Sequence, residues 1–153
     1  MSQNLGLILL VDDNEDDYEA TLRSLRKNHL LNPVHWCKSG GDARDYLYHQ
    51  GKYTDDDSVR RPTLMLLDLN MPGLDGRQLL RELKTDRDMC AIPTIILTTS
   101  NDPKDIEECY TLGASTFIQK PVEFEGLTKA IQTMKDYWFG IALLPKSDEA
   151  NNG

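Results

Sequence analysis

Asp68 is the residue of this chain whose position first suggests chemistry. It follows four consecutive apolar residues, Leu64 to Leu67, which lack the alternation of a half-exposed strand and so predict a strand covered on both faces. Asn70 and Pro72 then end the pattern. Open α/β sheets bind ligands at the carboxyl ends of such strands, although an Asp at this position also caps turns. Asp68 is therefore either a reactive or ligand-binding carboxylate or a turn residue.

Polar residues also follow the other predicted strands. Asp12 and Asp13 follow the first strand, Thr98 follows the fourth and Lys120 follows the fifth. If the first and third strands are neighbours, three carboxylates converge and repel one another unless a cation neutralises them, and oxygen ligands favour a hard ion such as Mg²⁺. One Asp could then be a nucleophile, while the Thr98 hydroxyl and the Lys120 ammonium hold phosphoryl oxygens. Each residue alone has an ordinary structural explanation, but their joint placement at one sheet edge indicates a site.

The elements that would position these residues alternate along the chain. Short apolar runs predict five strands, at residues 7–11, 34–37, 64–67, 94–97 and 115–118. Helical patterns separate them, at residues 15–28, 40–50, 76–86, between 103 and 113, and from 124 onward. Ser39, Asp75 and Asp102 are predicted N-caps, and Gly113 is a predicted C-cap. Strict alternation of strand and helix predicts an α/β fold with a doubly wound parallel sheet and right-handed crossovers.

Length, charge and cysteine content limit the class of protein. The 153 residues suit a single domain whose core needs no disulfide. Asp and Glu number 25 against 17 Lys and Arg, and the formal net charge of −8 argues against direct binding of nucleic acid. Three cysteines without a CxxC pair indicate reduced thiols and a cytoplasmic location. The apolar run at residues 7–11 is too short for a signal peptide or a membrane span, so we expect no membrane association.

Two polar segments interrupt the alternation. Residues 51–62 predict an extended surface loop. Asp55, Asp56 and Asp57 lie within it, and we interpret them as solvated charges rather than as a metal site. The last residues, 146–153, have the composition of a disordered tail.

Taken together, four motifs resemble the receiver domain of two-component response regulators over residues 5–139. They are VDDNEDD at 11–17, LMLLDLNMPGLDG at 64–76, LTTS at 97–100 and FIQKP at 117–121. The resemblance implies a flavodoxin-like three-layer sandwich whose five-stranded parallel sheet has the order 2-1-3-4-5. We therefore expect a receiver domain at residues 1–139 and a C-terminal tail at residues 140–153, without an output domain.

The receiver resemblance implies a role for each candidate site residue. Asp68 would accept a phosphoryl group from the histidine of a sensor kinase. A Mg²⁺ ion would be held by Asp12, Asp13, Asp68 and the backbone carbonyl of Asn70. The residues implied to bind the phosphoryl group are Thr98 and Lys120.

Two further residues gain roles from the same resemblance. Phe117 falls at the family's switch aromatic, which would swing inward when Thr98 moves toward the phosphoryl group; an ordinary core Phe is the alternative. Because Phe has no hydroxyl to bond in either position, such a switch would rest on packing alone. The peptide bond before Pro121 is expected to be cis.

A narrower likeness is to the single-domain regulators that serve phytochromes. It rests on the long segment at residues 50–70 and on DYWFGIALLP at residues 136–145. This likeness implies a phytochrome histidine kinase as partner. The apolar residues at 137–145 either fold back onto their own domain or extend a homodimer formed through the fourth helix, the fifth strand and the fifth helix.

An enzyme is the main alternative. Phosphatases of the haloacid-dehalogenase type also combine an aspartyl nucleophile, Mg²⁺, a hydroxyl and a Lys. Against that class, Asn70 replaces the second Asp that acts as general acid, and the acidic pair precedes the nucleophile in the chain. A flavodoxin-like cofactor binder is disfavoured because the first loop, DDNEDD, would repel a phosphate and holds no glycine. We therefore expect a signalling protein with only slow self-dephosphorylation.

Overall fold

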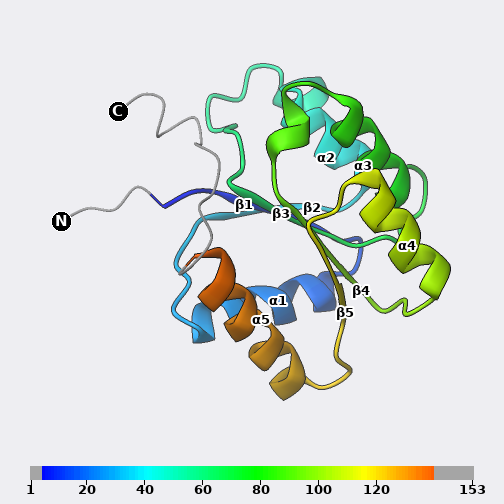
Figure 1. Ribbon diagram of the computed structural model, residues 1–153. Helices are drawn as coiled ribbons and strands as arrows, with labels where there is room; N and C mark the ends of the chain where they lie inside the picture. Colours follow the sequence, from blue (N-terminus) through cyan, green and yellow to red (C-terminus); the bar gives the residue numbers. More distant parts are fainter. Residues whose placement is uncertain (1–4, 140–153) are drawn as a thin grey trace.

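A computed structural model describes residues 5–139, whose strands form one sheet between two layers of helices (Figure 1). The strands are β1 (Ile8–Val11), β2 (Val34–Cys37), β3 (Leu64–Leu67), β4 (Thr94–Thr98) and β5 (Thr116–Gln119). Neighbouring strands are parallel throughout, and their order is β2-β1-β3-β4-β5. The predicted doubly wound sheet and its strand order are confirmed.

Helices cover both faces of the sheet. They are α1 (Glu15–Lys27), α2 (Gly40–Leu47), α3 (Gly76–Thr85), α4 (Pro103–Leu112) and α5 (Phe124–Trp138), with short 3₁₀ turns η1 (Gly51–Tyr53) and η2 (Met89–Ala91). The helices α1 and α5 pack on one face, and α2, α3 and α4 pack on the other (Figure 1). Because all strands run in the same direction, their carboxyl ends meet at one edge of the sheet, where α/β folds place their sites.

The central strands β1, β3 and β4 are buried on both faces. Leu9 and Leu67 join the apolar cluster under α2, α3 and α4, whereas Leu10 and Leu66 join the cluster under α1 and α5. Full burial of one such side chain contributes roughly 1.5–3 kcal/mol. This double burial explains why the strands are continuous apolar runs rather than alternating ones.

The helix ends follow local side-chain chemistry. Ser39 and Asp75 accept hydrogen bonds from backbone N–H groups in the first turns of α2 and α3. Asp102 does the same at the start of α4, and Gly113 ends that helix in the left-handed conformation, with φ of 110°. All four predicted caps are confirmed.

The bounds of three strands differ by one residue from the prediction. β1 begins at Ile8, β5 is shifted to Thr116–Gln119, and β4 extends to Thr98. The extension of β4 has a structural cause, because the Lys120 N–H donates to the Thr98 carbonyl at 2.6 Å and prolongs the pairing with β5. Thr98 and Lys120 are therefore held by the sheet rather than by free loops.

The segment at residues 51–62 is not the wholly exposed loop that the sequence predicted. It begins with η1, and the Tyr53 side chain is buried. The Tyr53 hydroxyl donates to Asp42 at 2.6 Å, and its ring packs edge-on against His35. A tyrosine ring is readily buried when its hydroxyl finds a partner, which the polarity of a segment does not reveal. Asp55 and Asp57 are exposed, as expected for solvated charges.

Parts of the C-terminal prediction lie outside the described residues. These are the tail at residues 140–153 and most of the apolar segment at residues 137–145. Tyr137, near the end of α5, is described and is exposed. Within residues 5–139, no helix has the length and apolar character needed to cross a lipid bilayer.

Candidate functional site

Three carboxylates meet at the carboxyl edge of the central strands. β1 and β3 pair with Val11 opposite Leu67, so the residues that follow, Asp12 and Asp68, emerge side by side. Carboxylate oxygens of Asp12, Asp13 and Asp68 all lie within 4.8 Å of one another. Asp12 and Asp68 are 2% and 8% exposed, whereas Asp13 faces solvent. The structure thus brings together the three carboxylates that the sequence predicted.

Lys120 reaches these carboxylates from the end of β5. Its Nζ lies 2.6 Å from Asp12 Oδ2, 3.0 Å from Asp17 Oδ2 and 3.7 Å from Asp68 Oδ2. The lysine side chain is only 9% exposed, so water screens these contacts less than it screens a surface ion pair. We call Lys120 with its surrounding carboxylates, including Asp13, the Lys120 cluster.

The Lys120 cluster carries more negative than positive charge. Burial raises the pKa of the Asp12 carboxyl above its ordinary value of 3.8, although the hydrogen bond from Lys120 acts against this rise. Burial by itself lowers the pKa of Lys120, but its hydrogen bond with Asp12 and the charge of Asp68 outweigh that effect and raise the pKa above 10.5. Lys120 therefore stays charged at neutral pH, and a further cation would relieve the remaining repulsion.

The donor set fits a hard divalent cation. Carboxylate oxygens are the ligands that Mg²⁺ and Mn²⁺ prefer, and two of the three carboxylates are buried, where uncompensated charge is costly. Asn70 lies in the loop between β3 and α3, two residues after Asp68, and is exposed. Its backbone carbonyl as a further ligand stays a prediction.

Thr98 contributes a buried hydroxyl at the end of β4. The residue is fully buried, and among the described residues its Oγ1 has no hydrogen-bond partner. Leaving a buried hydroxyl unpaired costs about 1–3 kcal/mol. If Thr98 were only a strand-forming residue, its position would be explained but its unpaired hydroxyl would not. A phosphoryl-binding role would explain both.

Asp17 was not among the predicted site residues. It lies in the first turn of α1, where acidic residues are common because they interact favourably with the helix dipole. A signal was nevertheless present in VDDNEDD, because Asp17 follows Asp13 by one helical turn. The contact with Lys120 could not be predicted, since it depends on where the first turn of α1 lies relative to the end of β5.

Gly76, the first residue of α3, lies directly against the backbone of Asp68. A Cβ at this position would clash with the Asp68 carbonyl oxygen and lie 2.8 Å from the Cα of Leu69. The Gly76 N–H also donates to the Leu69 carbonyl at 3.0 Å. Only glycine allows α3 to begin this close to the end of β3.

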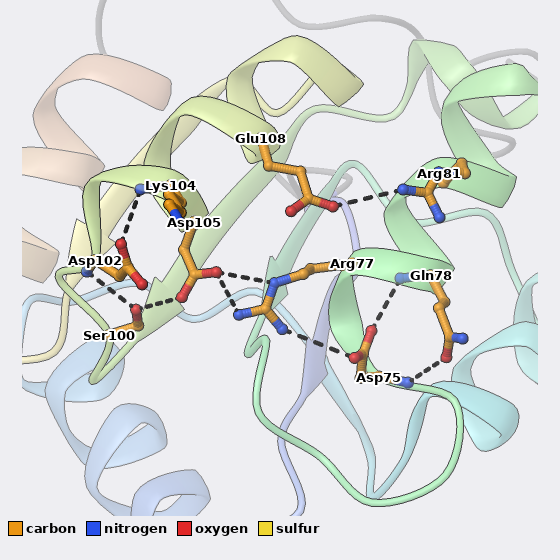
Figure 2. A network of polar contacts seen from close by, with 9 residues as sticks. All are labelled: Asp75, Arg77, Gln78, Arg81, Ser100, Asp102, Lys104, Asp105 and Glu108. Atoms are coloured by element: carbon orange, nitrogen blue, oxygen red, sulfur yellow. Dashed lines mark hydrogen bonds and ion pairs between the residues drawn. The ribbon is translucent and has the colours of Figure 1, made fainter.

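Figure 2 shows a second network of charges, between α3 and α4. Arg77 Nε and Nη2 donate to Asp105 Oδ1 at 3.1 and 2.6 Å, and the Ser100 hydroxyl donates to Asp105 Oδ2 at 2.6 Å. The bond from Ser100, followed by those from Arg77, lowers the pKa of Asp105 below 3.8. Ser100 lies two residues after Thr98, so this Arg77 network (Arg77, Asp105 and Ser100) anchors the loop between β4 and α4 to α3.

The remaining predictions from the receiver resemblance have different outcomes. The ring of Phe117 is half-buried and packs against the cluster under α2, α3 and α4, and its role as a switch stays a prediction. The expected cis bond before Pro121 is wrong, because the Lys120–Pro121 bond is trans, as are all peptide bonds of the described residues. The trans form of a bond to proline is favoured by about 0.5–1 kcal/mol, and the motif alone does not show what would offset this preference.

This fold and this site define a class of signalling protein, and comparison with known proteins places the chain in it. Residues 8–132 match the family model of the response regulator receiver domain. The chain belongs to this family, which acts in two-component signalling. The match does not favour the phosphatase alternative.

Three known proteins are similar over nearly their whole length. Response regulator Rcp1 of Synechocystis sp. is 32% identical over 139 residues, which are 91% of this chain and 92% of Rcp1. The crystal structure of the phosphorylated cyanobacterial phytochrome response regulator RcpA has a TM-score of 0.85 and 32% identity, covering 94% of this chain and 100% of that one. The bacteriophytochrome response regulator AtBRR has a TM-score of 0.73 and 39% identity, again covering 94% and 100%. The predicted class of protein is therefore confirmed.

Proposed function

We propose that this protein is a response regulator that accepts a phosphoryl group on Asp68 from the histidine of a sensor kinase. The observation that carries the proposal is the convergence of Asp12, Asp13 and Asp68, with oxygens within 4.8 Å, beside Lys120. The unpaired hydroxyl of Thr98 supports it independently.

Mg²⁺ is part of the proposal as the resident ion. Asp12, Asp13 and Asp68 would hold it with their carboxylates, and Asn70 would add its backbone carbonyl. When bound, the ion would neutralise the carboxylates and the charge of the incoming phosphoryl group. The solved Mn²⁺-bound form of Rcp1 supports this choice of a divalent ion.

The side chains of the chain then have separate tasks in the transfer. An oxygen of Asp68 forms a bond to phosphorus while the bond from phosphorus to the donor nitrogen breaks, which leaves an acyl phosphate on Asp68. Lys120 and Thr98 bind the oxygens of the transferred group. Thr98 thereby gains the hydrogen bond that it lacks among the described residues.

We assign the switch to Phe117 in the same proposal. The Phe117 N–H donates to the hydroxyl of Tyr110 on α4 at 3.1 Å. Phe117 also lies opposite Ile96 on β4, the strand that ends at Thr98. A movement of Thr98 toward the phosphoryl group would therefore change the packing of β5 and α4 together.

The central test is phosphorylation by acetyl phosphate, followed by intact mass spectrometry. We expect the unsubstituted chain to gain one phosphoryl group only when Mg²⁺ is present, and Asp68→Asn to gain none. Asp57→Asn, which removes an exposed carboxylate, is the matched control and should react normally. Full Mg²⁺-dependent phosphorylation of Asp68→Asn would exclude Asp68 as the acceptor.

We also propose that the protein is a phosphoacceptor and not an enzyme. Incubation with an aryl phosphate and Mg²⁺ should give at most slow turnover, limited by hydrolysis of the phosphoryl group on Asp68. Rapid multiple turnover on unactivated monoesters would favour the phosphatase alternative.

A phytochrome histidine kinase is the proposed partner. The support is the similarity to RcpA and AtBRR, which are named as phytochrome response regulators. We further propose a cytoplasmic location, in keeping with the free cysteines Cys37, Cys90 and Cys109. Faster phosphotransfer to Asp68 from a phytochrome kinase than from an unrelated sensor kinase would support the partnership, and equal rates would contradict it.

We propose a homodimer formed through α4, β5 and α5, with no direct contact to nucleic acid or membrane. A groove of about 530 Å³ on β5 and α5 supports it, lined by apolar and small residues that include Ile118, Met134, Tyr137 and Trp138. Tyr137→Arg should lower the sedimentation coefficient of a dimer, whereas Cys90→Arg, at an exposed position on η2, should not. A monomer at micromolar concentration, with and without a phosphoryl mimic, would exclude the dimer.

A further inference from the structure

Asp17 is the member of the Lys120 cluster that lies outside the three-carboxylate site. Its Oδ2 is 3.0 Å from Lys120 Nζ, and its side chain is 42% exposed, whereas that of Asp12 is 3% exposed. The backbone of Asp17 is fixed by the N-cap, because its N–H donates to Asn14 Oδ1 at 2.9 Å. Asp17 therefore holds one side of the Lys120 ammonium from a rigid position on α1.

Lys120 and an incoming divalent cation compete for Asp12. The bond from Lys120 uses Asp12 Oδ2 at 2.6 Å, and the same carboxylate is one of the three that would ligate the ion. An ammonium and a divalent cation on the same carboxylate repel each other, and the repulsion is strong where water screens it poorly. Binding of the ion therefore requires Lys120 to loosen its bond with Asp12.

An ammonium that loses its main partner in a buried position is unfavourable. Lys120 is only 9% exposed, so water cannot fully replace Asp12. Asp17 is the carboxylate in contact with Lys120 that the ion would leave untouched. Lysine also has three N–H donors, enough to keep Asp17 and to reach a group on Asp68, which lies 3.7 Å away.

We propose that Asp17 is a positioning residue that retains the Lys120 ammonium when a divalent cation takes Asp12, and so holds Lys120 ready for the phosphoryl group on Asp68. Asp17 itself contacts neither the ion nor the phosphoryl group. The inference rests on the proposed function, since it requires a cation bound by Asp12, Asp13 and Asp68.

The ordinary explanation of Asp17 is that it stabilises the first turn of α1. Glu15 and Asp16 serve that purpose equally well, because all three acidic residues lie in that turn. Asp16 is exposed, and it has the same charge and the same helical turn as Asp17. Asp16→Asn is therefore a matched control that removes a charge near the site without removing a contact to Lys120.

The test is the affinity of the full chain for Mg²⁺, measured by titration calorimetry. Asp17→Asn should weaken binding by about threefold to fivefold, a size typical of a partly exposed ion pair. Asp16→Asn should change it by less than about 1.5-fold, because screening by salt weakens the effect of a more distant charge. Asp17→Glu should recover most of the affinity.

A double-mutant cycle separates the proposed role from long-range electrostatics. With Lys120→Ala, no ammonium needs a second partner, so adding Asp17→Asn should weaken Mg²⁺ binding no more than Asp16→Asn does. Equal losses with and without Lys120, or no loss in Asp17→Asn at all, would overturn the proposal. Absence of Mg²⁺ binding in the unsubstituted chain would instead contradict the proposed function. Circular dichroism of each variant verifies that α1 is intact.

Discussion

The Lys120 cluster and the Arg77 network both join one basic residue to carboxylate oxygens, yet their charges are balanced differently. In the Arg77 network, Asp105 divides its two oxygens between Arg77 and Ser100 (Figure 2). In the Lys120 cluster, several carboxylates share a single ammonium. Positive and negative charges are matched in the first network, whereas negative charge is in excess in the second.

The pKa shifts of Asp105 and Asp12 reflect the same difference in charge balance. Ser100 and Arg77 lower the pKa of Asp105, so its charged form is favoured where it lies. Burial raises the pKa of Asp12, so its charged form is disfavoured despite Lys120. A network with matched charges stabilises the fold. In a network with excess negative charge the carboxylates repel one another, and a bound cation removes that repulsion, which favours its binding. The balanced network anchors the loop that follows Thr98, so the segment next to this residue is held to α3.

The largest expected effect comes from breaking the balanced network. Arg77→Met leaves the charge of Asp105 partly buried without its cationic partner, and we expect a loss of about 2 kcal/mol in the free energy of unfolding. The side chains of this pair are 22% and 18% exposed. Arg81→Met is the control, because its 3.5 Å contact with Glu108 is 57% and 42% exposed. Urea denaturation of both variants measures the two losses in the free energy of unfolding. Equal losses would show that greater burial does not make the Arg77–Asp105 pair more stabilising.

Removing a carboxylate should have opposite effects in the two regions. Without divalent ions, Asp68→Asn should raise the free energy of unfolding by about 1 kcal/mol, because it relieves like-charge repulsion. Asp105→Asn should lower it by about 1 kcal/mol, because it weakens bonds from Arg77 and Ser100. Saturating Mg²⁺ should stabilise the unsubstituted chain and narrow its gap to Asp68→Asn. A destabilising Asp68→Asn in metal-free buffer would show that the Lys120 cluster is balanced after all.

The pH dependence of stability should report the Arg77 network. The folded pKa of Asp105 lies below 3.8, its ordinary value in an unfolded chain, so Asp105 stabilises the fold above that value. Its contribution is lost as the pH falls from 3.8 through the lowered folded pKa. The difference in unfolding free energy between the unsubstituted chain and Asp105→Asn should therefore be constant from neutral pH to about pH 5 and shrink on acidification. A difference that persists in acid would assign the effect to packing.

The smallest expected effect concerns carboxylates that belong to neither region. Asp57 is exposed, and Asp57→Asn should change the free energy of unfolding by less than about 0.5 kcal/mol. Its affinity for Mg²⁺, measured by calorimetry, should equal that of the unsubstituted chain. A clear loss of affinity would show that the acidic run at residues 55–57 attracts the ion from a distance.

The sequence predicted the parts of the fold that depend on local patterns. The apolar runs at 34–37 and 64–67 coincide with β2 and β3, and Ser39, Asp75, Asp102 and Gly113 have the capping roles expected of them. These features depend on neighbours within one turn or one strand. The burial of Tyr53 was missed because it depends on Asp42, a partner eleven residues away on α2.

The part of the site that follows from the order of the strands could also be predicted from the sequence. Asp12, Asp13 and Asp68 follow parallel strands, so their convergence follows from topology. The contact of Asp17 with Lys120 spans 103 residues and depends on the placement of α1. The Arg77 network likewise joins α3 to the loop after β4. The sequence around Arg77 does not indicate that Asp105 is its partner. Long-range polar contacts are therefore what the sequence left undetermined.

The absence of a side chain at Gly76 also limits how this protein can evolve. Any other residue there would press on the backbone of Asp68, so a mutation would disturb the proposed acceptor without altering a single charge of the site. The absence of a Cβ at residue 76 is therefore required both for the packing of α3 and for the geometry of Asp68. Libraries that aim to redirect the protein to new partners should keep Gly76 fixed and vary exposed positions such as Arg81, more than one helical turn further along α3.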